Sequence, residues 1–70
     1  MEWIERSDVL YPVIWDYINN ETSEVHATVR RYNKQPWEVY VHGAGYGEFT
    51  NAEAAKMRAT AVVLHRFGLK

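Results

Sequence analysis

The stretch Val25-His26-Ala27-Thr28-Val29-Arg30 is followed, after a short polar segment, by Trp37-Glu38-Val39-Tyr40-Val41-His42. Apolar and polar residues alternate in both stretches, and a period of two is typical of a half-buried β-strand. Residues 32–36, Tyr-Asn-Lys-Gln-Pro, have the composition of a hairpin loop. The sequence therefore predicts an antiparallel hairpin that buries Val25, Trp37 and their alternate neighbours on one face.

A helix is the clearest element after this hairpin. Residues 52–67 lack Gly and Pro and are rich in Ala, the strongest helix former. Thr50 and Glu53 match a capping box, and Gly68 suits the C′ position. One face with helical spacing is predicted to pack on the sheet: Ala54, Met57, Ala61 and Leu64, with Val62 and His65 beside them. The basic residues Lys56, Arg58 and Arg66 are expected on the other side.

Two further strands are expected. Tyr46–Phe49 follows a glycine-rich turn and leads to the helix, and residues 13–18 are β-branched or aromatic. A helix over residues 8–17 is the alternative there, which Pro12 disfavours. The predicted fold class is α+β, a three- to four-stranded antiparallel sheet packed on one C-terminal helix. Residues 1–70 form a single domain: an N-terminal arm and first strand (1–23), the sheet (24–49) and the helix (50–68).

Composition and charge restrict the classes of function that this chain can have. The 70 residues contain no cysteine and carry a net charge of −1, which argues against a dedicated nucleic-acid binder. The acids gather before Arg30 and the bases after it, giving the halves formal charges of −5 and +4. We expect the halves to attract each other within one fold, or to form two faces of opposite sign. Without a signal peptide or a long apolar run, cytoplasmic localisation is the default expectation.

The candidate motifs for chemistry are weak. The glycines at 43, 45 and 47 do not fit a phosphate loop, and a tight turn with positive φ explains them better. His26 and His42 are cross-strand neighbours in the predicted hairpin and, with Glu38, form the only candidate metal site. No nucleophile is placed beside a base, and the domain is small for a substrate pocket. We therefore expect no enzymatic activity, no cofactor and no resident metal.

The face of the hairpin turned away from the helix is the best candidate binding surface. Tyr and Arg are enriched at interfaces, and both also suit nucleic acid. The candidate partner-binding residues are Arg30, Tyr32, Tyr40, His42 and His26, with Arg31 and Lys34 added for nucleic acid. The alternative is a solvated face stabilised by cross-strand pairs alone. The apolar residues of the arm either cap the core, form a homodimer contact or dock on a partner: Trp3, Ile4, Val9, Leu10 and Tyr11.

Residues 24–61 resemble a pattern in short phage and prophage proteins: Val25–Arg31, then Trp37–Val41, then Gly47-Glu48-Phe49-Thr50-Asn51-Ala52-Glu53-Ala54-Ala55. The same order is similar to the three-strand-plus-helix domains of the AP2-like family and of integrase arm-binding domains. That resemblance implies DNA reading by the sheet, with Arg30 and Tyr40 as the matching positions. A phage origin implies a small non-catalytic inhibitor of a host or defence protein. We therefore expect a protein-binding module, with DNA or RNA binding by the same face as the alternative.

Overall fold

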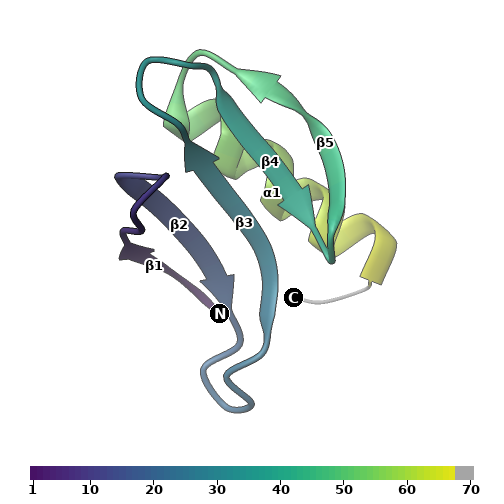
Figure 1. The fold of residues 1–70 in the computed structure, drawn as a ribbon. Coiled ribbons are helices and arrows are strands. Elements are labelled where there is room, and N and C mark those ends of the chain that lie inside the picture. Colours follow the sequence, from purple (N-terminus) through teal and green to yellow (C-terminus); the bar gives the residue numbers. More distant parts are fainter. Residues whose placement is uncertain (68–70) are drawn as a thin grey trace.

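The computed structural model describes residues 1–67, which form an antiparallel sheet with one helix behind it (Figure 1). The elements are β1 (Glu2–Arg6), β2 (Val13–Ile18), β3 (Val25–Arg31), β4 (Trp37–Val41), β5 (Ala44–Phe49) and α1 (Ala52–Phe67). Each strand pairs with the next in sequence, so the sheet order is β1-β2-β3-β4-β5. The α+β class with one C-terminal helix is confirmed, but the sheet has five strands where three to four were predicted.

The unpredicted strand is β1, in the segment expected to be an arm. Its residues pair antiparallel with β2, and Trp3 stacks on the ring of Tyr17 at a centroid distance of 4.8 Å. Three of its five residues are charged and exposed, so the sequence lacks the apolar alternation that marks a half-buried strand. The strand alternative for residues 13–18 is the one the structure shows, as β2.

Two local backbone features shape the end of the sheet. His42 and Gly43 connect β4 to β5, with φ values of 49° and 85°. Positive φ at both positions of a two-residue hairpin loop is the signature of a type I′ turn. Gly47, at φ 102°, lies where the register between β4 and β5 shifts, as in a β-bulge. The prediction that these glycines serve tight turns is confirmed for Gly43.

The helix begins one residue later than the capping box implies. The side-chain oxygen of Asn51 accepts hydrogen bonds from the amides of Glu53 at 2.7 Å and Ala54 at 3.3 Å. Asn51 is therefore the N-cap, and the predicted cap at Thr50 is wrong. The predicted C′ role of Gly68 lies outside the described residues.

The helix packs on β3, β4 and β5 through its smallest side chains. Its buried residues are Ala55, Ala59, Val62 and Val63, which meet the valines of β3 and β4: Val29, Val39 and Val41. Most of the predicted inward face is wrong, since Met57 is 72% exposed and Leu64 42% exposed, but Val62, predicted beside that face, is buried. Alanine at the contact lets the helix axis approach the sheet closely, and this leaves the larger side chains outside.

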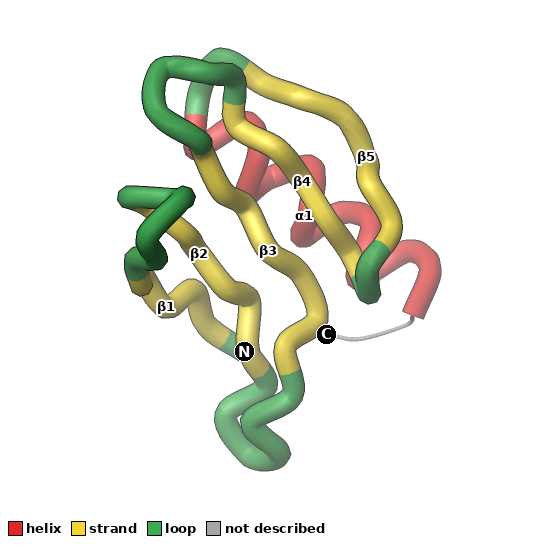
Figure 2. The backbone as a smooth tube through the Cα atoms, in the orientation of Figure 1, coloured by secondary structure: helices red, strands yellow, loops and turns green. Residues whose placement is uncertain are grey.

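The helix leaves the β1–β2 half of the sheet largely uncovered (Figure 2). One long side chain links the two parts. Lys56 extends from the helix so that its Nζ lies 3.4 Å from the ring centre of Trp15 and 5.8 Å from that of Trp3. The two indole rings and the lysine stem thus extend the core across β1 and β2.

Candidate functional site on the outer face of the sheet

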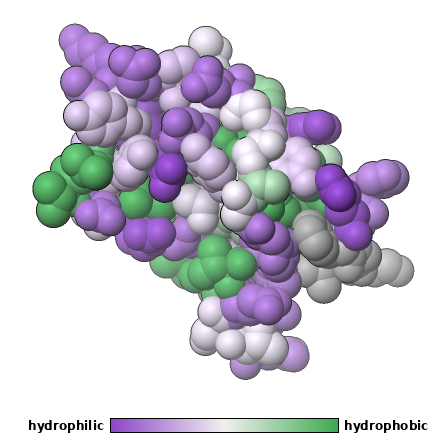
Figure 3. Space-filling view, turned by 45° about the vertical axis from the view of Figure 1, so that its right-hand side comes forward, coloured by the Kyte–Doolittle hydropathy of each residue, from purple (hydrophilic) through white to green (hydrophobic). Residues whose placement is uncertain are grey.

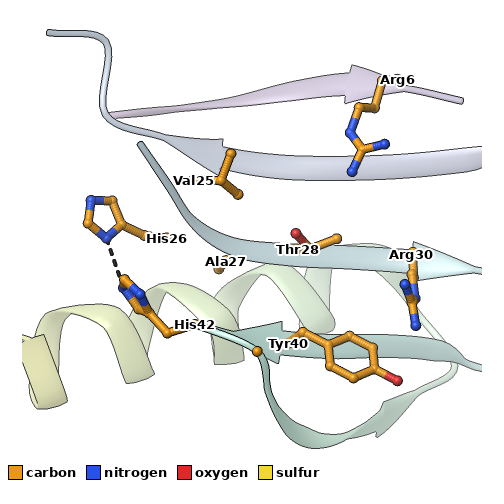
Figure 4. Close-up of a pocket in the computed structure, with 9 residues that line it drawn as sticks. Arg6, Val25, His26, Ala27, Thr28, Arg30, Tyr40 and His42 are labelled. Carbon is orange, nitrogen blue, oxygen red and sulfur yellow. Dashed lines mark hydrogen bonds between the residues drawn. The ribbon is translucent and has the colours of Figure 1, made fainter. Parts of the chain in front are cut away.

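The face turned away from the helix, here called the outer face, is hollowed into a shallow pocket of about 400 Å³. Cross-strand register brings its polar side chains together, because Arg6 lies opposite Ile14, Ile14 opposite Arg30, and Arg30 opposite Glu38. Figure 4 shows the lining residues, which come from β1, β3, β4 and the turn after β4: Arg6, Val25, His26, Ala27, Thr28, Arg30, Tyr40, His42 and Gly43.

Arg30 is held between two aromatic rings. Its guanidinium carbon lies 4.3 Å from the ring centre of Tyr11 and 4.5 Å from that of Tyr40, and its Nε donates to Glu38 at 3.1 Å. Partial burial acts to lower the pKa of Arg30, but hydrogen bonds to Glu38 and Tyr40 outweigh it and the pKa lies above its ordinary value. The guanidinium is therefore fixed in position and permanently charged.

Arg6 is fixed by a buried carboxylate. Asp16 is only 5% exposed, and it accepts a hydrogen bond from Arg6 Nε and another from the Thr28 hydroxyl at 3.0 Å. The hydrogen bond to Asp16 raises the pKa of Arg6 above its ordinary value, despite the opposing effect of burial. A buried carboxylate that has two donors is satisfied, so this group stabilises the floor of the outer face.

The two histidines form a pair at the end of the pocket. His26 Nδ1 and His42 Nε2 lie 3.0 Å apart, so one ring donates to the other, and the rings meet edge to face. His26 is 5% exposed, and its Nε2 lies 2.9 Å from a carboxylate oxygen of Glu24 without the alignment of a hydrogen bond. His42 is the first residue of the type I′ turn, and its amide donates to the His26 carbonyl at 3.3 Å. The pair was predicted as cross-strand neighbours, and the structure joins them directly.

The charge of the pocket is balanced. Arg6 is paired with Asp16 and Arg30 with Glu38, so the two guanidinium groups bring little net positive charge to the surface. Arg30 and Glu38 are each about a third exposed, at 32% and 30% of their side chains. The surface therefore offers hydrogen-bond donors of fixed direction and aromatic rings, and only a weak positive electrostatic potential.

The structure brings four of the seven predicted binding residues to the pocket: Arg30, Tyr40, His26 and His42. Of these, His26 is too buried to offer much surface. Tyr32 lies beside the pocket, half exposed, with its ring 5.9 Å from that of Tyr11. Lys34 lies exposed in the β3–β4 turn. Alternation places Arg31 on the opposite face of β3, where its Nε donates to the Gln35 carbonyl and its guanidinium lies 5.7 Å from the Trp37 ring.

Three residues around the pocket were not among those predicted for the outer face. Arg6 and Asp16 enter through the pairing of β1 with β2, and β1 was not recognised as a strand. Tyr11 reaches Arg30 from the β1–β2 loop, which a hydrogen bond from the Asp8 amide to the Tyr11 carbonyl closes into a turn. Arg6 is the only Lys or Arg before Arg30, in a segment that is otherwise acidic. This was the one feature of the sequence that could have indicated an ion pair at Arg6.

Within residues 1–67, no three His, Cys, Asp or Glu side chains converge to hold a metal ion. Glu38, the third member of the candidate metal site, pairs with Arg30 instead. The helix in the described part of the chain is too short and too polar to cross a membrane.

Comparison with known proteins gives no match: no family model, no curated protein and no solved structure is similar to this chain. The resemblance to short phage proteins and to AP2-like domains stays a prediction. Function is therefore inferred from the geometry of the outer face.

Proposed function

We propose that this chain is a non-catalytic binding module whose outer face docks on a protein partner. The observation that carries the proposal is the fixed guanidinium of Arg30 between the rings of Tyr11 and Tyr40. Side chains that are already ordered lose little conformational entropy on binding, and Tyr and Arg provide much of the energy at protein interfaces.

The balanced charge favours protein over nucleic acid. A phosphate backbone is bound through net positive charge and counterion release, whereas Asp16 and Glu38 neutralise the two arginines of the pocket. A protein surface supplies carboxylates and carbonyls that accept from the remaining guanidinium N–H groups. Figure 3 shows a view of the surface that is mostly hydrophilic with small, separate hydrophobic patches, which suits a polar interface.

The test compares matched variants in a pull-down from cells that express the chain, with the captured protein then titrated against purified chain. Arg30→Glu and Tyr40→Ala remove the two central groups, and Arg58→Glu makes the same charge change on an exposed position of the helix. We expect the first two to weaken binding about tenfold or more and Arg58→Glu to leave it unchanged. Equal binding by all three variants would exclude the outer face.

Nucleic-acid binding by the same face is the second candidate, because Tyr32 lies exposed with its ring near that of Tyr11, and Lys34 lies exposed in the β3–β4 turn. It is tested by fluorescence titration with duplex and single-stranded DNA at low and high salt. Stacking on Tyr40 would quench emission, and phosphate contacts would weaken steeply with salt. Salt-sensitive quenching that Tyr40→Ala abolishes would replace the protein-binding proposal. A phage origin and an inhibitor role stay predictions.

A further inference from the structure

We propose that two copies of this chain pair through their β1 strands, antiparallel and around a two-fold axis at Ile4. Within the described residues, β1 pairs with β2 on one side, and no strand pairs with its other side. Its register with β2 has no irregularity, unlike the β2–β3 and β4–β5 pairs. A regular edge strand without proline or a bulge is a template for another strand.

The charges of β1 select one way for it to pair with itself. In the strand Glu2-Trp3-Ile4-Glu5-Arg6, an antiparallel two-fold at Ile4 sets Glu2 opposite Arg6 of the second copy, twice. A parallel, in-register pairing would set Glu2 against Glu2 and Glu5 against Glu5. Opposite charges across a strand pair stabilise it and like charges destabilise it. Arg6 is half exposed, so it has donors left after its bond to Asp16.

The same register places apolar surface at the junction on both faces. On the outer face Ile4, 41% exposed, would meet Ile4 of the second copy. On the helix face a groove lies between β1 and the helix, lined by Trp3 of β1 and by six helix residues: Glu53, Lys56, Met57, Thr60, Ala61 and Leu64. Trp3 would face Glu5 of the second copy, close to the Lys56 ammonium. Pairing would thus bring together the two sheet halves that the helices leave uncovered.

The pairing is argued from the free edge of β1 and not from the outer-face proposal, although Arg6 has a part in both. It is tested first by sedimentation of the unmodified chain over a range of concentrations. We expect a concentration-dependent dimer. Ile4→Lys would place two like charges at the two-fold and shift the chain to monomer, while Val9→Lys, at a position 96% exposed in the loop, would leave the dimer unchanged. A monomer mass at every concentration would overturn the proposal, and so would a dimer that Ile4→Lys leaves intact.

Cross-linking tests the register. The chain has no cysteine, so Ile4→Cys introduces a single thiol. Residues directly opposite in an antiparallel pair have Cα atoms about 4.5–5.5 Å apart, which a disulfide can span. Under mild oxidation Ile4→Cys should form a covalent dimer about tenfold or more faster than Val9→Cys or Glu2→Cys. The two Glu2 positions would lie about 13 Å apart along the strands. Fastest cross-linking at Glu2 would refute the two-fold at Ile4, and equal rates at Ile4 and Val9 would refute the pairing.

Discussion

At the scale of single residues, His42 combines a turn with a polar contact. Its φ of 49° lies in the left-handed region, which Asn and His tolerate better than β-branched residues do. His42→Asn and His42→Val both remove the ring that meets His26, but only valine strains the backbone. We expect His42→Val to be less stable than His42→Asn by about 1–2 kcal/mol in urea unfolding. Equal stability of the two variants would show that the turn does not depend on this residue.

Arg6 provides a test of pH dependence. Its pKa is raised in the folded state, so its contribution to stability is complete below its unfolded pKa and is lost only when the pH rises through the higher folded pKa. Arg6→Gln leaves Asp16 buried with a weaker partner. We expect a loss of about 1–2 kcal/mol that is the same at about pH 6 and about pH 9. The control is Arg58→Gln on the exposed side of the helix, and a loss that differs between the two pH values would contradict this account.

Much of the pocket could be predicted at this scale. Alternation and the hairpin register decide that His26, Arg30, Tyr40 and His42 share a face, and both can be read from the sequence. Burial of His26 could not be read, because it depends on the irregular register between β2 and β3. The contact of Tyr11 with Arg30 could not be read either, since it depends on how the β1–β2 loop folds back.

At the scale of elements, the buried alanines of α1, Ala55 and Ala59, here called the alanine stripe, set the distance between helix and sheet. Ala59 is fully buried, whereas Ala54 is exposed on the face that the sequence assigned to the core. Ala59→Leu should therefore lower the free energy of unfolding by about 1–3 kcal/mol through overpacking. The matched change Ala54→Leu should alter it by less than about 0.5 kcal/mol. If thermal or urea unfolding showed a larger loss for Ala54→Leu than for Ala59→Leu, the helix face predicted from the sequence would be the buried one.

The elements themselves were largely predictable, and the errors have physical causes. Strands β2 to β4 and the helix follow from alternation, propensity and glycine-free length. The predicted helix face was mostly wrong because hydrophobicity ranks methionine and leucine above alanine, while a close helix–sheet contact selects for small size. Strand β1 was missed because an edge strand with one solvated side can carry charges at most positions.

At the scale of the whole molecule, Lys56 joins the helix to the half of the sheet that the helix does not cover. Its side chain is 16% exposed and lies over Trp15. Lys56→Met keeps the apolar stem and should cost about 0.5–2 kcal/mol through the lost cation–π contact. Lys56→Ala also uncovers the rings and should cost about 1 kcal/mol more. Unfolding followed by circular dichroism measures both, with exposed Lys34→Ala as the control, and a null result for Lys56→Ala would exclude this link.

Among residues 1–67, the ion pairs between strands do not join the acidic half to the basic half. Arg6–Asp16 lies within the acidic half and Arg30–Glu38 within the basic half. Both pairs connect neighbouring strands, because sequence neighbours are also neighbours in this sheet. The charge asymmetry therefore describes the surface of the folded chain more than the force that folds it.

Because the helix packs mainly on β3, β4 and β5, different strands of the sheet should open at different rates. In a single copy, β1 is held by one strand neighbour and by the rings near Lys56, so it should open locally at a lower free energy than the helix-covered strands. Amide hydrogens of β1 would then exchange with deuterium well before those of β3 and β4. The chain would consist of a slowly exchanging centre built on the alanine stripe and a margin that opens and closes while the rest stays folded.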